Sequence, residues 1–282
     1  MTDAESRPTR DTSPATPLAA DRREESRGRR RLLLDLAFRG LRAAGLRAGN
    51  FYTTVGIFLV AGVVIAIAGT LAFAGIGEWV REGGTQQYDV AVLQWMNRQH
   101  TPLLTQIATE LTYLGTGSVV LMIVAVAALF LWHTEHKHSA RLLLASVAGN
   151  ILLNGILKLY FARPRPAVFE WQTHAASSSF PSGHAMSATV TYATVAYLVM
   201  RLQKHHWSRV LTGTAAVILI VLVCTTRLYL GVHYPSDVIA GMLIGLAWAA
   251  FCMATLEASL VLARRRAPRE VVEERRAPNE VA

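Results

Sequence analysis

The sequence predicts an all-α membrane protein, a helical bundle with six transmembrane helices, and three observations lead to this fold class. Hydrophobic residues make up 52% of the 282 residues, whereas charged residues make up only 17%. The apolar residues are concentrated in runs of roughly 20 residues or more, the length that a hydrocarbon core about 30 Å thick requires. The loops between the runs also differ in their basic content. The six runs cover 53–75, 103–132, 140–160, 183–201, 208–229 and 236–262.

The second run, 103–132, is longer than a bilayer requires, so we expect its first residues to lie at the membrane surface. Before it, the amphipathic stretch "YDVAVLQWMNRQH" (88–100) carries Trp95. Tryptophan is enriched at the boundary between lipid and water, because its ring is apolar and its N–H is polar. We therefore expect this stretch to lie in the interface.

The chain divides into three regions. Residues 1–50 are predicted to form a cytoplasmic tail, 51–263 the membrane domain and 264–282 a second cytoplasmic tail. Within the first tail, 1–28 has too few apolar residues to form a core, so we expect it to be disordered. Residues 29–49 place apolar side chains at helical spacing among arginines. This pattern predicts either a basic amphipathic helix lying on anionic lipid or a frayed, partly helical linker.

Lysine and arginine gather in four flanking segments and loops, and short cytoplasmic loops carry an excess of these residues. With six crossings these four segments all fall on one side, which the rule assigns to the cytoplasm. The three opposite loops, 76–102, 161–182 and 230–235, hold only four basic residues. Both termini are therefore expected in the cytoplasm. The residues that decide the orientation are Arg29, Arg30, Arg31, Arg39, Arg42, Arg47, Lys137, Arg141, Arg201, Lys204, Arg209, Arg264, Arg265 and Arg266.

The formal net charge of +9 is thus explained by orientation and by contacts with anionic lipid. Nucleic-acid binding is not favoured, because the basic residues are not combined with base-stacking aromatic side chains. Histidines at 133–138 ("HTEHKH") and at 205–206 match no standard metal spacing, so we interpret them as solvated loops. Cys224 and Cys252 fall inside apolar runs and are interpreted as small buried residues.

Three short segments at the predicted outer ends of the helices concentrate ionisable side chains: "KLYFARPRP" (158–166), "PSGH" (181–184) and "RLYLGVHYPSD" (227–237). Ionisable groups near membrane depth are costly and mark functional sites. Three cations, two imidazoles and a carboxylate suit a strongly anionic group such as a phosphomonoester. The alternative, cations that only snorkel at the membrane edge, is less expected on this side. The residues are Lys158, Arg165, Arg227, His184, His233 and Asp237.

The "PSGH" segment precedes the apolar run at 183–201 and predicts a phosphate-binding helix start. The free N–H groups and the positive dipole end of that helix would face the anion. Gly183 would let the main chain approach closely, and Ser182 would donate its hydroxyl. Together with Lys158, Arg165 and Arg227, these two residues form the predicted phosphate-binding set.

The two histidines and the carboxylate are predicted to be the catalytic residues. Asp237 lies four residues after His233 and would accept the Nδ1–H of its ring, leaving Nε2 free to attack phosphorus. His184 would act as general acid, protonating the departing oxygen. Water would then cleave the phosphohistidine, with His184 as base.

The order Lys-x6-Arg-Pro, Pro-Ser-Gly-His, Arg-x5-His-x3-Asp resembles the type 2 phosphatidic acid phosphatase superfamily, which shares its site with bacterial class A acid phosphatases and vanadium haloperoxidases. The resemblance covers about residues 55–260. It implies a phosphatase that needs no metal or other cofactor and that forms a phosphohistidine. Thr226 stands where the family often has serine, and both carry a hydroxyl. Arg163 lies outside the pattern and is expected to contact lipid head groups.

These inferences favour an integral membrane enzyme that hydrolyses a lipid phosphate or diphosphate at the periplasmic or exterior side. Phosphatidic acid, phosphatidylglycerol phosphate and undecaprenyl diphosphate are candidate substrates, among which the motifs do not choose. Two other classes stay open. The phosphoryl group could pass to an acceptor hydroxyl in a lipid phosphotransferase, or the chain could be a non-catalytic protein that binds or transports lipid phosphates.

Overall fold

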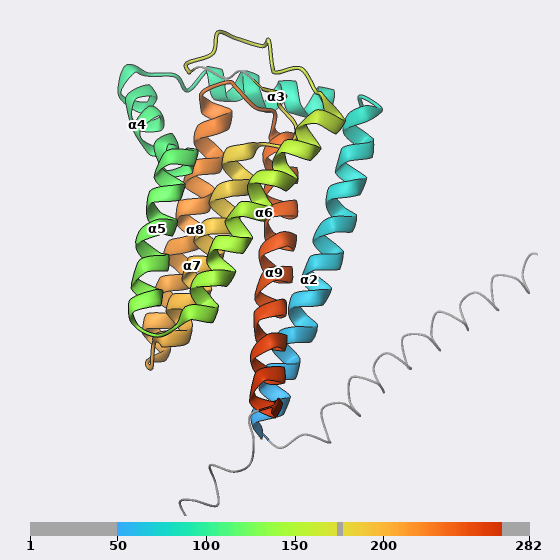
Figure 1. Ribbon diagram of the computed structural model, residues 1–282. Helices are drawn as coiled ribbons and strands as arrows, with labels where there is room; N and C mark the ends of the chain where they lie inside the picture. The colour runs from blue at the N-terminus through green and yellow to red at the C-terminus, as the bar shows by residue number, and fades with distance from the viewer. Residues whose placement is uncertain (1–49, 174–176, 267–282) are drawn as a thin grey trace, which may run out of the picture. The chain divides into compact units, whose positions relative to one another are not determined.

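A computed structural model describes residues 50–173 and 177–266, and every regular element in these ranges is a helix (Figure 1). The predicted all-α class is confirmed. The predicted disordered segment 1–28 and the basic helix at 29–49, with its anionic lipid partner, lie outside the described residues. The helices are α2 (Asn50–Arg81), α3 (Gln86–Asn97), α4 (Pro102–Thr112), the 3₁₀ turn η1 (Tyr113–Gly115), α5 (Gly117–His133), α6 (Lys137–Phe161), α7 (Gly183–Leu202), α8 (His206–Tyr229) and α9 (Pro235–Arg266).

The fold described below is that of the unit that begins at Ile57. In that unit α7 is the central helix, packed against α5, α6, α8 and α9. Its buried residues include Thr189, Thr191 and Thr194 beside Val190 and Leu198. Protein neighbours rather than lipid surround this helix, so it carries hydroxyl side chains that a lipid-facing helix would avoid.

Among the described residues, four helices are long and apolar enough to cross a membrane: Leu59–Arg81 within α2, then α6, α8, and Pro235–Ser259 within α9. The bent pair Pro102–Gly115 and Gly117–His133 raises the number to five if it counts as one crossing. The prediction that 183–201 is one of six apolar crossings is not confirmed, because α7 does not reach the hydropathy of the other spans. Its threonine and serine content is the physical reason.

The long predicted run 103–132 is divided into α4 and α5, which are bent by 49° at the break around η1. Thr101 accepts a hydrogen bond from the backbone N–H of Leu104 at the start of α4, and Pro102 occupies the first turn, where its missing N–H has no cost. The bend shows that 103–132 is not one straight helix, whereas the expectation that its first residues lie at the membrane surface stays a prediction.

Before α4, the short helix α3 crosses the end of the bundle in Figure 1. Its two faces differ: Asp89 and Leu93 are buried, whereas Tyr88 and Trp95 are 61% and 51% exposed. The amphipathic stretch predicted at 88–100 is therefore helical over most of its length, with aromatic rings on the outer face.

Candidate active site

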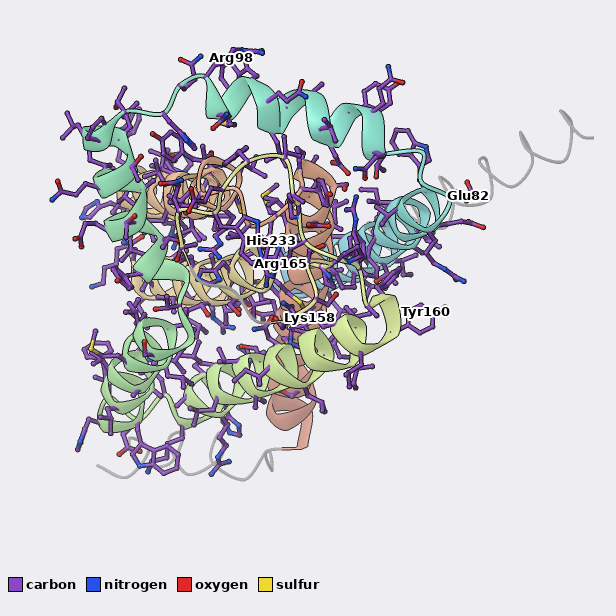
Figure 2. All side chains as sticks on the ribbon, turned by 90° about the horizontal axis from the view of Figure 1, so that it is seen from above. Glu82, Arg98, Lys158, Tyr160, Arg165 and His233 are labelled. Atoms are coloured by element: carbon purple, nitrogen blue, oxygen red, sulfur yellow. The ribbon has the colours of Figure 1, made fainter. Side chains whose placement is uncertain are left out.

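The three predicted segments meet at one end of the bundle, where α6 and α8 end and α7 and α9 begin. Viewed along the helices, Lys158, Arg165 and His233 lie near one another in the middle of the ring of helices, whereas Glu82 and Arg98 lie at its rim (Figure 2). Ala162 ends α6 in the left-handed conformation. The two prolines of "RPRP" follow and prevent the helix from continuing, so the chain turns back across this end.

Lys158 and Arg165 are held by the same short segment. The Lys158 ammonium donates to Ser177 Oγ and to the Ser178 carbonyl, both at 2.8 Å. Arg165 Nε donates to the Ser177 carbonyl at 2.8 Å, and its NH1 donates to the Val232 carbonyl at 2.7 Å. Neither cation pairs with a carboxylate among the described residues, so both keep their charge available for an anion.

Arg227 enters the site from the last turn of α8 and is only 3% exposed. Its NH1 donates to Thr112 Oγ1 at 2.7 Å, which ties it to the end of α4. Its Nε has no hydrogen-bond partner among the described residues. A buried guanidinium with an unused donor and no counter-ion is costly, and a bound anion would remove that cost.

His233 is fully packed, at 2% exposure, and its two ring nitrogens face different partners. Nε2 lies 3.3 Å from Arg165 NH1, and Nδ1 lies 3.6 Å from Asp237 Oδ2. Arginine only donates, so Nε2 carries the lone pair and Nδ1 carries the proton. The predicted pairing of His233 with Asp237 is therefore present as a close approach, just longer than a hydrogen bond.

The imidazole of His233 is held neutral. Burial lowers its pKa to about 4, against the opposing effect of the Asp237 carboxylate and with a smaller contribution from Arg165 and Arg227. Above that pH the ring has an unprotonated nitrogen. A neutral imidazole with its lone pair toward a cationic pocket is the state that a nucleophile requires.

Ser182 is the N-cap of α7, where its Oγ accepts from the backbone N–H of Ala185, and it is fully buried. Its own N–H donates to the Asp237 carbonyl at 3.0 Å, which joins the starts of α7 and α9. Gly241 allows this approach, because a Cβ there would lie 2.7 Å from the Ser182 carbonyl oxygen. The predicted helix start at Gly183 is confirmed, while the hydroxyl of Ser182 serves the cap.

His184 follows in the first turn of α7 and is half-buried. It lies within electrostatic range of Arg227, His233, Lys158 and Arg165. Gly115, at the bend between α4 and α5, packs against its ring, since a Cβ there would lie 3.1 Å from His184 Cδ2. The bend in the second run thus brings backbone beside a predicted catalytic residue.

Arg163 does not contact head groups as expected. Its guanidinium turns inward, where NH1 lies 2.5 Å from Asp237 Oδ1 and NH2 lies 2.9 Å from Asp89 Oδ2. It also lies over the ring of Tyr234, 4.2 Å from the centroid. The inward pairing of Arg163 was not predicted from the sequence. The residue that could have indicated it is Asp89, a carboxylate on the buried face of an amphipathic helix.

The charges form two groups. Lys158, Arg165 and Arg227 carry three positive charges without carboxylate partners among the described residues, and Asp89, Arg163 and Asp237 together carry a net single negative charge. The sum is two positive charges, which matches the roughly two negative charges of a phosphomonoester. Among the described residues, no group of three His, Cys, Asp or Glu side chains lies close enough to hold a metal.

Comparison with known proteins identifies the family. The model of the PAP2 superfamily matches residues 139–260, which contain all three segments. Phosphatidylglycerophosphatase B of Bacillus subtilis (strain 168) is 31% identical over 180 residues, which are 62% of this chain and 87% of the relative. The chain belongs to the PAP2 superfamily.

Other similarities place this PAP2 chain among membrane proteins. An undecaprenyl-diphosphatase of Sulfolobus acidocaldarius is 28% identical over 184 residues, covering 63% of this chain and 83% of the relative. The crystal structure of a transmembrane PAP2 type phosphatidylglycerolphosphate phosphatase from Bacillus subtilis superimposes with a TM-score of 0.63 at 26% identity. That match covers 72% of this chain and 98% of the other, so nearly the whole of that fold is present here.

Proposed function

We propose that this PAP2 protein is an integral membrane phosphatase that removes a phosphate or diphosphate head group from a lipid without a metal. The observation that carries the proposal is the set of three cations, without carboxylate partners among the described residues, around a neutral imidazole. The relatives are named as a phosphatidylglycerophosphatase and an undecaprenyl-diphosphatase, which supports a lipid substrate.

In the proposed mechanism, Lys158, Arg165 and Arg227 bind the non-bridging oxygens and neutralise the charge that develops on them. Nε2 of His233 forms a bond to phosphorus while the bond from phosphorus to the lipid oxygen breaks. His184 gives that oxygen a proton. Asp237 stabilises the positive charge that appears on the His233 ring.

The second half restores the enzyme. A water molecule gives its proton to His184 and attacks phosphorus, the bond to Nε2 breaks, and inorganic phosphate leaves. The N–H groups at the start of α7, from Gly183 onward, add donors for the phosphate. Ser182 contributes by fixing that helix start through its cap.

We also propose that α7 crosses the membrane, which brings the number of spans to six. A helix of 20 residues is about 30 Å long, enough to cross the hydrocarbon core, and α6, α8 and α9 shield its hydroxyl groups. Six crossings put both termini in the cytoplasm and the site at the periplasmic or exterior face. The basic segment 29–49 would then meet the anionic inner leaflet.

The chemistry of the site favours a phosphoryl-transfer enzyme over a protein that only binds or transports lipid phosphates. A lipid-binding or transport protein would need the cations but no ring nitrogen kept neutral by burial. Transfer to an acceptor hydroxyl would use the same intermediate, so only the products separate it from hydrolysis. Release of free phosphate identifies a hydrolase, whereas a phosphorylated acceptor identifies a transferase.

The test is phosphate release by purified protein in detergent, with phosphatidic acid, phosphatidylglycerol phosphate and undecaprenyl diphosphate as substrates. Wild-type protein should release phosphate from at least one of these in excess chelator. His233→Ala should release none from any of them. Turnover by His233→Ala equal to that of wild type would refute the nucleophile, and a requirement for added metal would refute the metal-free site.

A further inference from the structure

Arg163 lies between two buried carboxylates that come from distant parts of the chain. Asp237, at the start of α9, is 0% exposed as a side chain, Asp89 on α3 is 2% exposed, and Arg163 itself is 10% exposed. Each carboxylate takes a different nitrogen of the guanidinium. A planar fork can hold two carboxylates in this way, whereas a lysine ammonium can act only as a single point charge.

Asp89 also holds the first turn of α9 directly. Its Oδ1 accepts from the backbone N–H of Ser236 at 2.9 Å, and its Oδ2 accepts from the Ser236 hydroxyl at 2.6 Å. A carboxylate at a helix N-terminus satisfies free N–H groups and interacts favourably with the dipole. On α3, Leu93 is fully buried one turn after Asp89, so packing fixes the helix that supplies this carboxylate.

These contacts determine where the Asp237 carboxylate points. Its Oδ1 is bound to Arg163 NH1, and its Oδ2 accepts from the backbone N–H of Tyr234 at 2.8 Å. With both oxygens held, Oδ2 stays 3.6 Å from Nδ1 of His233. If Arg163 lost its second partner, the guanidinium could turn about Asp237 and change the field at His233.

We propose that Asp89 and Arg163 are positioning residues, which hold the Asp237 carboxylate toward His233 through the chain Asp89–Arg163–Asp237. This inference rests on the proposed function, because it assigns a task to Asp237 only if His233 reacts. Neither residue touches the substrate in this scheme. Each acts through Asp237, so its loss should lower the rate of the chemical step while substrate binding is retained.

The experiment measures phosphate release from dioctanoyl phosphatidic acid in detergent micelles by the full-length protein. The variants are Asp89→Asn, which keeps the size of the side chain, and Arg163→Lys, which keeps its charge but not its fork. Loss of an outer hydrogen-bond partner of a metal ligand costs about 10- to 100-fold, and we take this range as the scale for an outer partner of Asp237. We expect kcat to fall by that amount in both variants, with KM within about twofold of wild type.

Glu257→Gln is the matched control, because Glu257 pairs with Arg201 at 2.6 Å at the other end of α7 and α9. This variant also breaks a partly buried ion pair, so it reports the general cost of such a loss. Its kcat should equal that of wild type. A second readout combines Asp89→Asn with Asp237→Asn. If Asp89 acts through Asp237, the double variant should be no slower than Asp237→Asn alone, whereas an independent structural role would add its own loss.

The outcomes distinguish failure of the positioning role of Asp89 and Arg163 from failure of the proposed function. Wild-type kcat in folded Asp89→Asn or Arg163→Lys, with His233→Ala inactive, would overturn the positioning role and leave the proposed function intact. An additive loss in the double variant would also overturn it. Activity in His233→Ala would instead overturn the proposed function itself.

Discussion

The two ends of the helical bundle differ in whether their cationic side chains are paired with carboxylates. At the end of α7 away from the site, Arg201 pairs with Glu257 of α9, and the Tyr197 hydroxyl donates to the same carboxylate. At the site end, Lys158, Arg165 and Arg227 come together and none of them contacts a carboxylate among the described residues. The positive charge of Arg201 is neutralised by a carboxylate, whereas the three positive charges at the site end have no carboxylate partner and would be neutralised by a bound anion.

A second contrast lies within the site end. Arg163 and Arg165 are two residues apart in "RPRP", yet Arg163 is paired with two carboxylates and Arg165 with none. Only Pro164 separates the two residues, so their different partners are set by the surrounding helices and loops rather than by their distance in the sequence. In the proposed mechanism, the cation without a counter-ion binds substrate, and the cation with two counter-ions positions a residue that assists the reaction.

Among the variants that test the contrast between unpaired and paired cations, Arg227→Lys should lower kcat the most. The variant keeps the positive charge but loses the planar fork and the bond to Thr112. Losing one donor to the developing charge typically lowers kcat by about 10²–10³. Phosphate release should fall by this amount while the protein remains folded. An unchanged kcat would mean that charge alone is enough and that the site does not use the geometry of the guanidinium.

The second test is the pH dependence of kcat/KM, which reports the pKa values of the enzyme without substrate. Burial lowers the pKa of His233 to about 4, and the Asp237 carboxylate opposes that shift. Below this pH the ring gains a proton and loses its nucleophilic lone pair, so the acid limb for His233 should lie near pH 4 rather than near its ordinary value of 6.5. Asp237→Asn removes the opposing charge and should move the limb to lower pH. A move to higher pH in the same substrate would contradict the assignment.

Glu257→Gln has the smallest expected effect on activity. It removes the charge that pairs with Arg201 and accepts from Tyr197, and a hydrogen bond to a charged group contributes about 1.5–3 kcal/mol. The unfolding temperature in detergent should fall, while kcat and KM stay at their wild-type values. A loss of kcat in this variant would show that the two ends are coupled and would weaken the comparison.

The sequence predicts the positions of residues that lie in its three motifs better than those of residues outside them. The convergence of Lys158, Arg165, Arg227 and His233 was predictable, because each lies at the end of an apolar run and alternate run ends share a side. The role of Arg163 was not, since its partner Asp89 lies 74 positions away on a helix that carries none of the three motifs. The prediction of α7 as an apolar crossing did not anticipate its lower hydropathy, which is tolerated because a helix enclosed by other helices does not need a lipid-facing surface.

The bend after α4 shows a similar limit. The length of the run 103–132 predicted that its first residues lie at the membrane surface, but length alone predicts neither a break nor its position. That position is set by tertiary packing: Gly115 lies against Val223 of α8 and against His184, where any side chain would collide. The contact exists only once three helices are assembled, so no local pattern predicts it.

The phosphohistidine intermediate can be trapped and located in the chain. Wild-type protein mixed with phosphate-labelled phosphatidic acid and quenched in alkali within one turnover should carry label on a single residue, and peptide mapping should place it at His233. The label should be absent from His233→Ala. Label on another residue, or a quenched enzyme that turns over substrate without ever carrying label, would contradict the account.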